Sequence, residues 1–164
     1  MNLKKIITAL SFCLLLSCGY EPIYSKKNNN SNYNFSINTI NYIGDSEANN
    51  ILKNKLKKIL NKEKKSPAIN LNLNSRVEKI VTSKDKKGNP IKFLIEIIIN
   101  LEIFENEILK HKNEFKEKFE YDNLSNKFNL KQYEKNIKDN LISILSDEII
   151  RYLNSPRWYL NHTK

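Results

Sequence analysis

The sequence has few of the residues from which metal and acid–base sites are usually built. Its two histidines, His111 and His162, stand far apart, on a lysine-rich segment and in the C-terminal tail. Its two cysteines form no pair at metal-ligand spacing with a histidine or with each other. Three glycines in 164 residues leave no glycine-rich loop to hold a phosphate. We therefore expect no catalytic residue, no metal site and no bound cofactor.

Near the N-terminus an apolar run is too short to cross a bilayer, which takes a helix of about 20 apolar residues. Residues 6–16 are almost uninterruptedly apolar, and Lys4 and Lys5 precede them. A positive segment, a short apolar segment and a small residue at the cut are the parts of a secretory signal. We predict that residues 1–17 are a signal peptide and that the rest of the chain is exported.

The end of this segment resembles the lipobox of bacterial lipoproteins. Leu15, Leu16 and Ser17 stand directly before Cys18. The resemblance implies cleavage before Cys18, diacylglycerol on its sulfur and an acyl chain such as palmitate on its new amine. One acyl chain binds a membrane only marginally, whereas two or more hold a protein stably. The alternative, a buried helix with a chance cysteine, is disfavoured by the polar stretch that follows. The residue directly after Cys18 is Gly19 and not an aspartate, which in enterobacteria-like sorting of lipoproteins favours the outer membrane.

The cysteines and the net charge predict two properties of the mature protein, its lack of a disulfide and its basic surface. Cys13 would leave with the signal and Cys18 would be acylated, which leaves no thiol for a disulfide. The formal net charge is +10, and losing Lys4 and Lys5 lowers it by two. A basic surface attracts anionic lipid, lipopolysaccharide phosphates or nucleic acid, and export argues against nucleic acid. The richness in Lys, Asn and Ile is equally what an AT-rich genome produces.

A polar tether and one domain follow the signal. Residues 25–32 have nothing to bury, so we expect a lipidated tether over 18–32 and a single α/β domain over 33–164. Alternating apolar residues predict a strand from 33 to Gly44, with a shift of face that indicates a bulge. Asp45 or Ser46 then caps a helix that runs to about residue 62.

Strand periodicity returns after Ser66-Pro67. We predict strands over 68–81, 91–104 and 108–121, joined by a turn at 86–90 and a tight connection at 105–107. The inward residues of the last two are expected to be Ile95, Ile97, Ile99, Leu101, Ile103, Phe115, Phe119 and Tyr121. The last strand should turn Lys112, Glu114, Lys116 and Lys118 outward.

A second helix is predicted over 130–154, ended by Ser155-Pro156. Its expected apolar stripe is Tyr133, Ile137, Leu141, Ile144, Leu145, Ile149, Tyr152 and Leu153. The order β-α-β-β-β-α predicts an α+β two-layer sandwich, a mostly antiparallel four-stranded sheet with two helices on one face. The first helix can carry the chain to a parallel neighbour of the first strand, and the strand order stays open.

The residues after the predicted cut resemble a known family. Cys18-Gly19-Tyr20-Glu21-Pro22-Ile23-Tyr24 is similar to the Cys-Gly-aromatic-x-Pro-Leu-Tyr opening of LPS-assembly lipoproteins of the LptE type, especially the alphaproteobacterial ones. The predicted element order and long final helix are also similar to that family's sandwich. The resemblance implies an outer-membrane lipoprotein of a Gram-negative cell that faces the periplasm. It also implies partnership with the LptD barrel, as plug and assembly factor, in lipopolysaccharide transport.

No local motif marks the contact residues. The basic loop of Lys84, Lys86 and Lys87 with Lys92 is one candidate for lipopolysaccharide or partner contact, and a solvated hairpin tip is its plainer interpretation. Arg157 and Trp158, followed by Tyr159, are a second candidate, and they could equally pack the tail onto the sheet. An auxiliary lipoprotein of another periplasmic lipid-transport complex, or a structural lipoprotein tether, remain alternative functions.

Overall fold

The structure, a computed structural model, describes residues 35–60 and 67–155. These residues belong to one compact unit, Tyr33–Lys164. The elements are β1 (Ser36–Gly44), α2 (Ser46–Leu56), η2 (Lys57–Ile59), β2 (Ala68–Lys84), β3 (Pro90–Glu105), β4 (Ile108–Asp122) and α3 (Lys127–Asn154). Apart from the short 3₁₀ turn η2, they follow the predicted order β-α-β-β-β-α.

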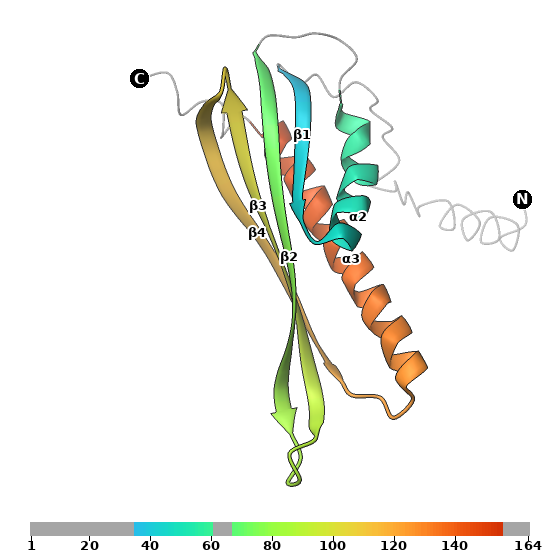
Figure 1. The fold of residues 1–164 in the computed structure, drawn as a ribbon. Coiled ribbons are helices and arrows are strands. Elements are labelled where there is room, and N and C mark those ends of the chain that lie inside the picture. The colour runs from blue at the N-terminus through green and yellow to red at the C-terminus, as the bar shows by residue number, and fades with distance from the viewer. Residues whose placement is uncertain (1–34, 61–66, 156–164) are drawn as a thin grey trace, which may run out of the picture. The chain divides into compact units, whose positions relative to one another are not determined.

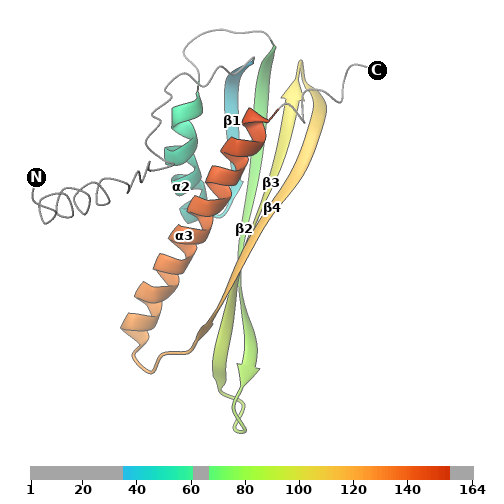
Figure 2. The same ribbon diagram turned by 180° about the vertical axis from the view of Figure 1, so that it is seen from behind.

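The sheet has the strand order β1-β2-β3-β4. β1 runs parallel to β2, which it reaches through α2, and the other pairs are antiparallel. Both helices lie on the same face of the sheet (Figures 1 and 2). This confirms the predicted α+β two-layer sandwich, and the strand order that the sequence left open is the simplest one.

The corner between β1 and α2 depends on one glycine and one cap. Gly44 has φ +97°, and a Cβ there would lie 1.9 Å from the carbonyl oxygen of Ser75. The side chain of Asp45 then accepts a hydrogen bond of 2.8 Å from the backbone N–H of Ala48, which confirms the predicted N-cap. The predicted bulge also exists, as a register shift between Ile37 and Thr39. The α-helix is shorter than predicted, because the chain tightens into η2 after Leu56.

The core lies between the inner face of the sheet and the helices. The predicted row Ile95, Ile97, Ile99, Leu101 and Ile103 is buried along β3. β3 has a strand on each side, so these side chains meet neighbours laterally as well as from the helices. The core is completed by side chains from the other elements, including Leu52, Leu56, Leu71, Leu73, Leu145 and Ile149.

Three predicted burials are wrong. Phe119 shares the inner face with Phe115 and Tyr121 but is 43% exposed, because β4 is an edge strand with a neighbour on one side only. In the second helix Ile144 is 45% exposed and Tyr133 is 40% exposed, whereas Ile142 is buried. α3 packs against both α2 and the sheet, so its buried arc is wider than the predicted stripe and extends to Ile142 and Ser146.

No helix of the described residues covers the opposite face of the sheet, which is mostly polar but includes Ile80, Leu94 and Ile98. The four β4 residues expected to point outward are exposed. Two of them form cross-strand ion pairs with β3, Lys112 with Glu102 at 3.2 Å and Lys116 with Glu96 at 2.9 Å. Such pairs between neighbouring strands stabilise a solvent-facing sheet modestly.

Candidate functional site: the β2–β3 hairpin tip

The predicted basic loop is the turn that joins β2 to β3, and a single aspartate closes it. One carboxylate oxygen of Asp85 accepts hydrogen bonds from the backbone N–H groups of Lys87 and Asn89, both at 2.8 Å. Its other oxygen accepts from the side-chain amide of Asn89 at 3.0 Å. Gly88 has φ +87°, a conformation that costs glycine little. The turn is therefore a defined structure, consistent with its turn-rich sequence.

Hydrogen bonding also fixes the charge of Asp85. The side-chain and backbone hydrogen bonds from Asn89, joined by those from Lys87 and Gly88, hold the pKa of Asp85 below its usual value. A carboxylate that accepts several hydrogen bonds stays ionised more readily. The loop thus combines one fixed negative charge with a group of lysines.

The structure separates the four predicted lysines into two sets. Lys84, Lys86 and Lys87 are exposed around the turn. Lys92 points toward β4, where its Nζ lies 3.7 Å from a carboxylate oxygen of Glu120 and 4.0 Å from one of Asp122. Lys92 therefore already faces negative charge, while the other three lysines offer their ammonium groups to solvent or a ligand.

Aliphatic side chains flank these lysines, which sequence reasoning did not single out. Ile80, Val81 and Ile91 are all exposed on the strands just before and after the turn. Strand periodicity places Val81 and Ile91 on the inner face of the sheet. Their exposure could be predicted only if it were known where the helices stop covering that face. The hairpin end thus offers cations at its turn and apolar surface beside them.

A polar cluster ties the first turns of α3 to this half of the sheet. The carboxylate of Glu134 accepts hydrogen bonds from Lys79 on β2 and from the hydroxyl of Tyr121 on β4, the latter at 2.8 Å. The ammonium of Lys79 also lies 4.0 Å from the ring centroid of Phe93, a cation–π distance. Three separate elements supply the cluster, so no local sequence signal could predict it.

The protonation of this cluster follows from its contacts. Burial opposes ionisation of Glu134, but the hydrogen bonds from Lys79 and Tyr121 and the charges of Lys79 and Lys138 outweigh it and lower its pKa. Burial, with the neighbouring carboxylate of Glu134, raises the pKa of Tyr121. At neutral pH the carboxylate of Glu134 accepts hydrogen bonds from the side chain of Lys79 and the neutral phenol of Tyr121. These contacts stabilise the packing of α3 on the sheet.

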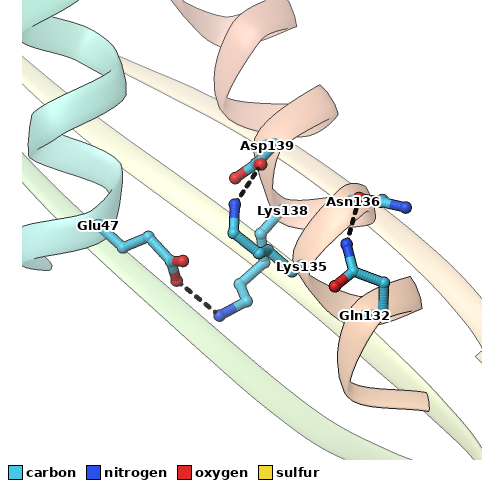
Figure 3. A network of polar contacts seen from close by, with 6 residues as sticks. All are labelled: Glu47, Gln132, Lys135, Asn136, Lys138 and Asp139. Carbon is cyan, nitrogen blue, oxygen red and sulfur yellow. Dashed lines mark hydrogen bonds and ion pairs between the residues drawn. The ribbon is translucent and has the colours of Figure 1, made fainter. Parts of the chain in front are cut away.

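A second charged surface joins the helices (Figure 3). Lys138 of α3 pairs with Glu47 of α2 at 2.9 Å, and Lys135 pairs with Asp139 one turn along α3 at 2.7 Å. A hollow of about 470 Å³ lies here, lined by Glu47, Phe128, Lys131, Gln132, Glu134, Lys135 and Lys138. Because carboxylates already face most of its lysines, it is a weaker anion site than the hairpin tip.

The other predicted site residues cannot be placed. Leu15, Leu16, Ser17 and Cys18, and the pair Arg157 and Trp158, lie outside the described residues. Within 35–60 and 67–155, no helix is long and apolar enough to span a membrane. The same ranges contain no group of three or more His, Cys, Asp or Glu side chains arranged to hold a metal ion.

Solved structures share this fold. The rare lipoprotein B of Shewanella oneidensis matches with a TM-score of 0.56 and 14% identity, over 76% of this chain and 100% of that one. A minor lipoprotein of Acinetobacter baumannii matches with a TM-score of 0.55 and 13% identity, over 76% of this chain and 93% of that one. No protein-family model and no curated protein matches the sequence. At these identities the likeness establishes the fold.

Proposed function

We propose that this chain is a lipoprotein anchored through Cys18 in the outer membrane, facing the periplasm, where it partners an LptD-type barrel in lipopolysaccharide assembly. Its action would be binding, with no bond made or broken in the lipid. The β2–β3 hairpin tip would contact the phosphate groups of lipopolysaccharide through Lys84, Lys86 and Lys87.

The observation that carries the proposal is the sandwich fold. It agrees with the fold that the opening Cys18–Tyr24 implies through its family resemblance. The two solved structures reported above also carry the word lipoprotein in their names. Because a fold alone hosts many functions, the seven residues that begin at Cys18 give the proposal its specificity.

The chemistry of the tip suits a phosphorylated lipid. Ammonium groups bind phosphates as point charges. Val81 on the inner face and Ile80 on the opposite face supply exposed apolar surface for acyl chains near them. An amphipathic lipid would then meet both kinds of surface within one rigid hairpin.

The partner is tested by purifying the tagged, membrane-extracted protein from its native cells and identifying what accompanies it by mass spectrometry. We expect an LptD-type barrel in near-equal amount. The intact mass should show removal of residues 1–17 and acyl chains on Cys18, and Cys18→Ser should remove both changes. Recovery of another transport complex would favour an auxiliary lipoprotein of that system. Recovery of no lipid-transport component would favour a structural tether.

Lipid contact is tested by titrating lipopolysaccharide into the full chain. Exposed ion pairs contribute about 0.2–1 kcal/mol each, so K86Q/K87Q should weaken binding roughly 2- to 30-fold. K53Q/K57Q removes the same charge from two exposed lysines of the α2–η2 segment and is the matched control. Added salt should weaken wild-type binding more than binding by K86Q/K87Q, because salt screens exposed charges. Equal losses in the two variants would remove the tip from the proposal.

A further inference from the structure

The hairpin between β3 and β4 ends in two exposed aliphatic side chains. Ile108 is 61% exposed and Leu109 is 49% exposed. The turn before them consists of Asn106 and Glu107, both with positive φ, as in the tight two-residue turns that match strand twist. A short turn of this kind holds its flanking residues at a fixed place, so the two side chains project from a narrow and rigid tip.

This tip lies at the end of the sheet where β1, the first strand, begins. The register crosses all four strands in one row, from Ile37 to Ile69, from Ile69 to Glu105 and from Glu105 to Ile108. Strands lie about 4.8 Å apart, so Ile108 is only about 15 Å from the first residues of β1. Figure 1 shows the start of β1 and the β3–β4 turn at the same end of the sheet.

A third exposed aliphatic residue follows η2. α2 runs back from the Gly44 end of β1 toward the end where β1 begins (Figure 2), and Leu60, which is 41% exposed, comes directly after η2. Beside the β3–β4 turn Lys110 pairs with Glu105 at 3.6 Å, and the exposed Glu107 adds one negative charge in the turn itself.

We propose that this end of the domain rests on the lipid surface that holds the acyl chains of Cys18, with Ile108 and Leu109 inserted at the boundary between headgroups and acyl chains. Exposed apolar side chains enter that boundary with a strength that scales with the apolar area they bury there. Two side chains on a narrow tip are also far too little surface for a stable protein interface, which buries more than about 1,000 Å².

The anchor makes weak insertion sufficient. The chain between Cys18 and Ile37 spans at most about 65 Å, so the tip stays close to the membrane at a high effective concentration. The inference rests on the proposed lipid anchor. It adds a second membrane contact at the end of the sheet opposite the lysine tip.

The experiment uses the full chain purified from membranes, with an environment-sensitive fluorophore on Ile108→Cys or, as control, on Lys87→Cys at the opposite hairpin. Each protein is mixed with phosphatidylcholine vesicles that contain nitroxide-labelled lipid, and its intact mass reports lipidation of Cys18. We expect at least threefold stronger quenching at position 108 than at 87. Adding Leu109→Asp, a change at an exposed position, should reduce the quenching at 108 toward the level at 87.

The outcomes separate the two ideas. Equal quenching at 108 and 87 in lipidated protein overturns the tip contact and leaves the anchor intact. Quenching at 108 in protein whose mass shows no lipid removes the anchor and supports the tip contact. Protein that carries no lipid and shows no quenching removes both. A label at 108 that is shielded from water but not quenched by lipid identifies a protein surface as the occupant and overturns the proposal.

Discussion

The two hairpins of the sheet share strand β3 and differ in almost everything else. At the Pro90 end of β3 the turn carries Lys84, Lys86 and Lys87 and is closed by the side chain of Asp85. At the Glu105 end the turn is two residues long and is followed by Ile108 and Leu109. A strand of 16 residues rises about 3.3 Å per residue, so the tips lie about 50 Å apart.

The difference shows how the two ends of one sheet can present different surfaces, one aliphatic and one cationic. The aliphatic tip lies at the end of the sheet where β1 begins, and the lysine tip lies at the far end. A domain anchored near one end could use apolar residues there for a second membrane contact and keep its cations for a ligand elsewhere. The arrangement is consistent with both the proposed anchor and the proposed lipid contact.

The largest effect on the free energy of unfolding is expected from a substitution in β3, the strand that both hairpins share. Ile97→Ala should lower the free energy of unfolding by about 2–5 kcal/mol, because it leaves a cavity under the helices. Ile98→Ala is the matched control, since Ile98 is 5% exposed but lies on the open face, between Arg76 and Lys116 in the register. Urea denaturation should show a smaller loss for Ile98→Ala, and equal losses would contradict a core confined to one face.

A moderate effect is expected where α3 is tied to the lysine half of the sheet. Glu134→Gln should lower the free energy of unfolding by roughly 1–3 kcal/mol, because Lys79 and Tyr121 lose a charged acceptor. Glu148→Gln, later in α3, is the control and should change it little. Hydrogen exchange should be faster in the first turns of α3 in Glu134→Gln alone, and uniform exchange along α3 would sink the idea of a local tie.

The same cluster predicts a pH dependence. The pKa of Glu134 is lowered in the folded state, so its contribution is fully present above the ordinary glutamate pKa of about 4.3. It is lost as pH falls through the lower, folded pKa. Stability measured from pH 6 downward should therefore decline less steeply in Glu134→Gln than in the wild type.

Smaller effects of opposite sign are expected at the two turns. Gly88→Ala should cost about 1 kcal/mol, because φ is +87° there although nothing lies within 4 Å of the added Cβ. Glu107→Gly should stabilise by roughly 0.5 kcal/mol, because relief of the left-handed strain at φ +67°, about 1–2 kcal/mol, exceeds the roughly 0.5–1 kcal/mol of extra unfolded-state entropy that glycine brings. Thermal unfolding of the two variants checks this, and a loss in both would mean that the Glu107 side chain has a contact that outweighs its strain.

The smallest effect on stability is expected from the lysines of the tip. K86Q/K87Q should leave the free energy of unfolding within about 0.5 kcal/mol of the wild type, since both side chains are exposed. Paired with the lipopolysaccharide titration, this separates a binding role from a structural one. A larger loss of stability would place these lysines in the fold.

Periodicity predicted the elements well because each depends on its own residues. The buried row of β3, the Asp45 cap and the order of elements are all written in short stretches of sequence. Phe119 was misplaced because β4 is an edge strand with a neighbour on one side only, and Tyr133 and Ile144 because the buried side of α3 depends on how it packs against α2 and the sheet. Those are properties of the assembled layers.

The candidate site was likewise predicted only where its residues are neighbours in sequence. The lysine loop was visible because its residues are neighbours in sequence, and so was its turn. The separation of Lys92 from the other three lysines needs the position of Glu120, and the tie at Glu134 needs residues from three elements. Contacts of this kind are fixed by the packing of the chain, so sequence reasoning could not reach them.

The parallel pairing of β1 with β2 has a consequence for the order of folding. Glu105 meets Ile108 across a tight turn, whereas Ser36 must find Ala68 after the chain has passed through α2. Contacts between distant residues close larger loops and form more slowly. We expect the β2–β3–β4 meander to form first and β1 to be added last, so the strand nearest the tether would be the last part of the sheet to gain protection in pulse-labelling hydrogen exchange.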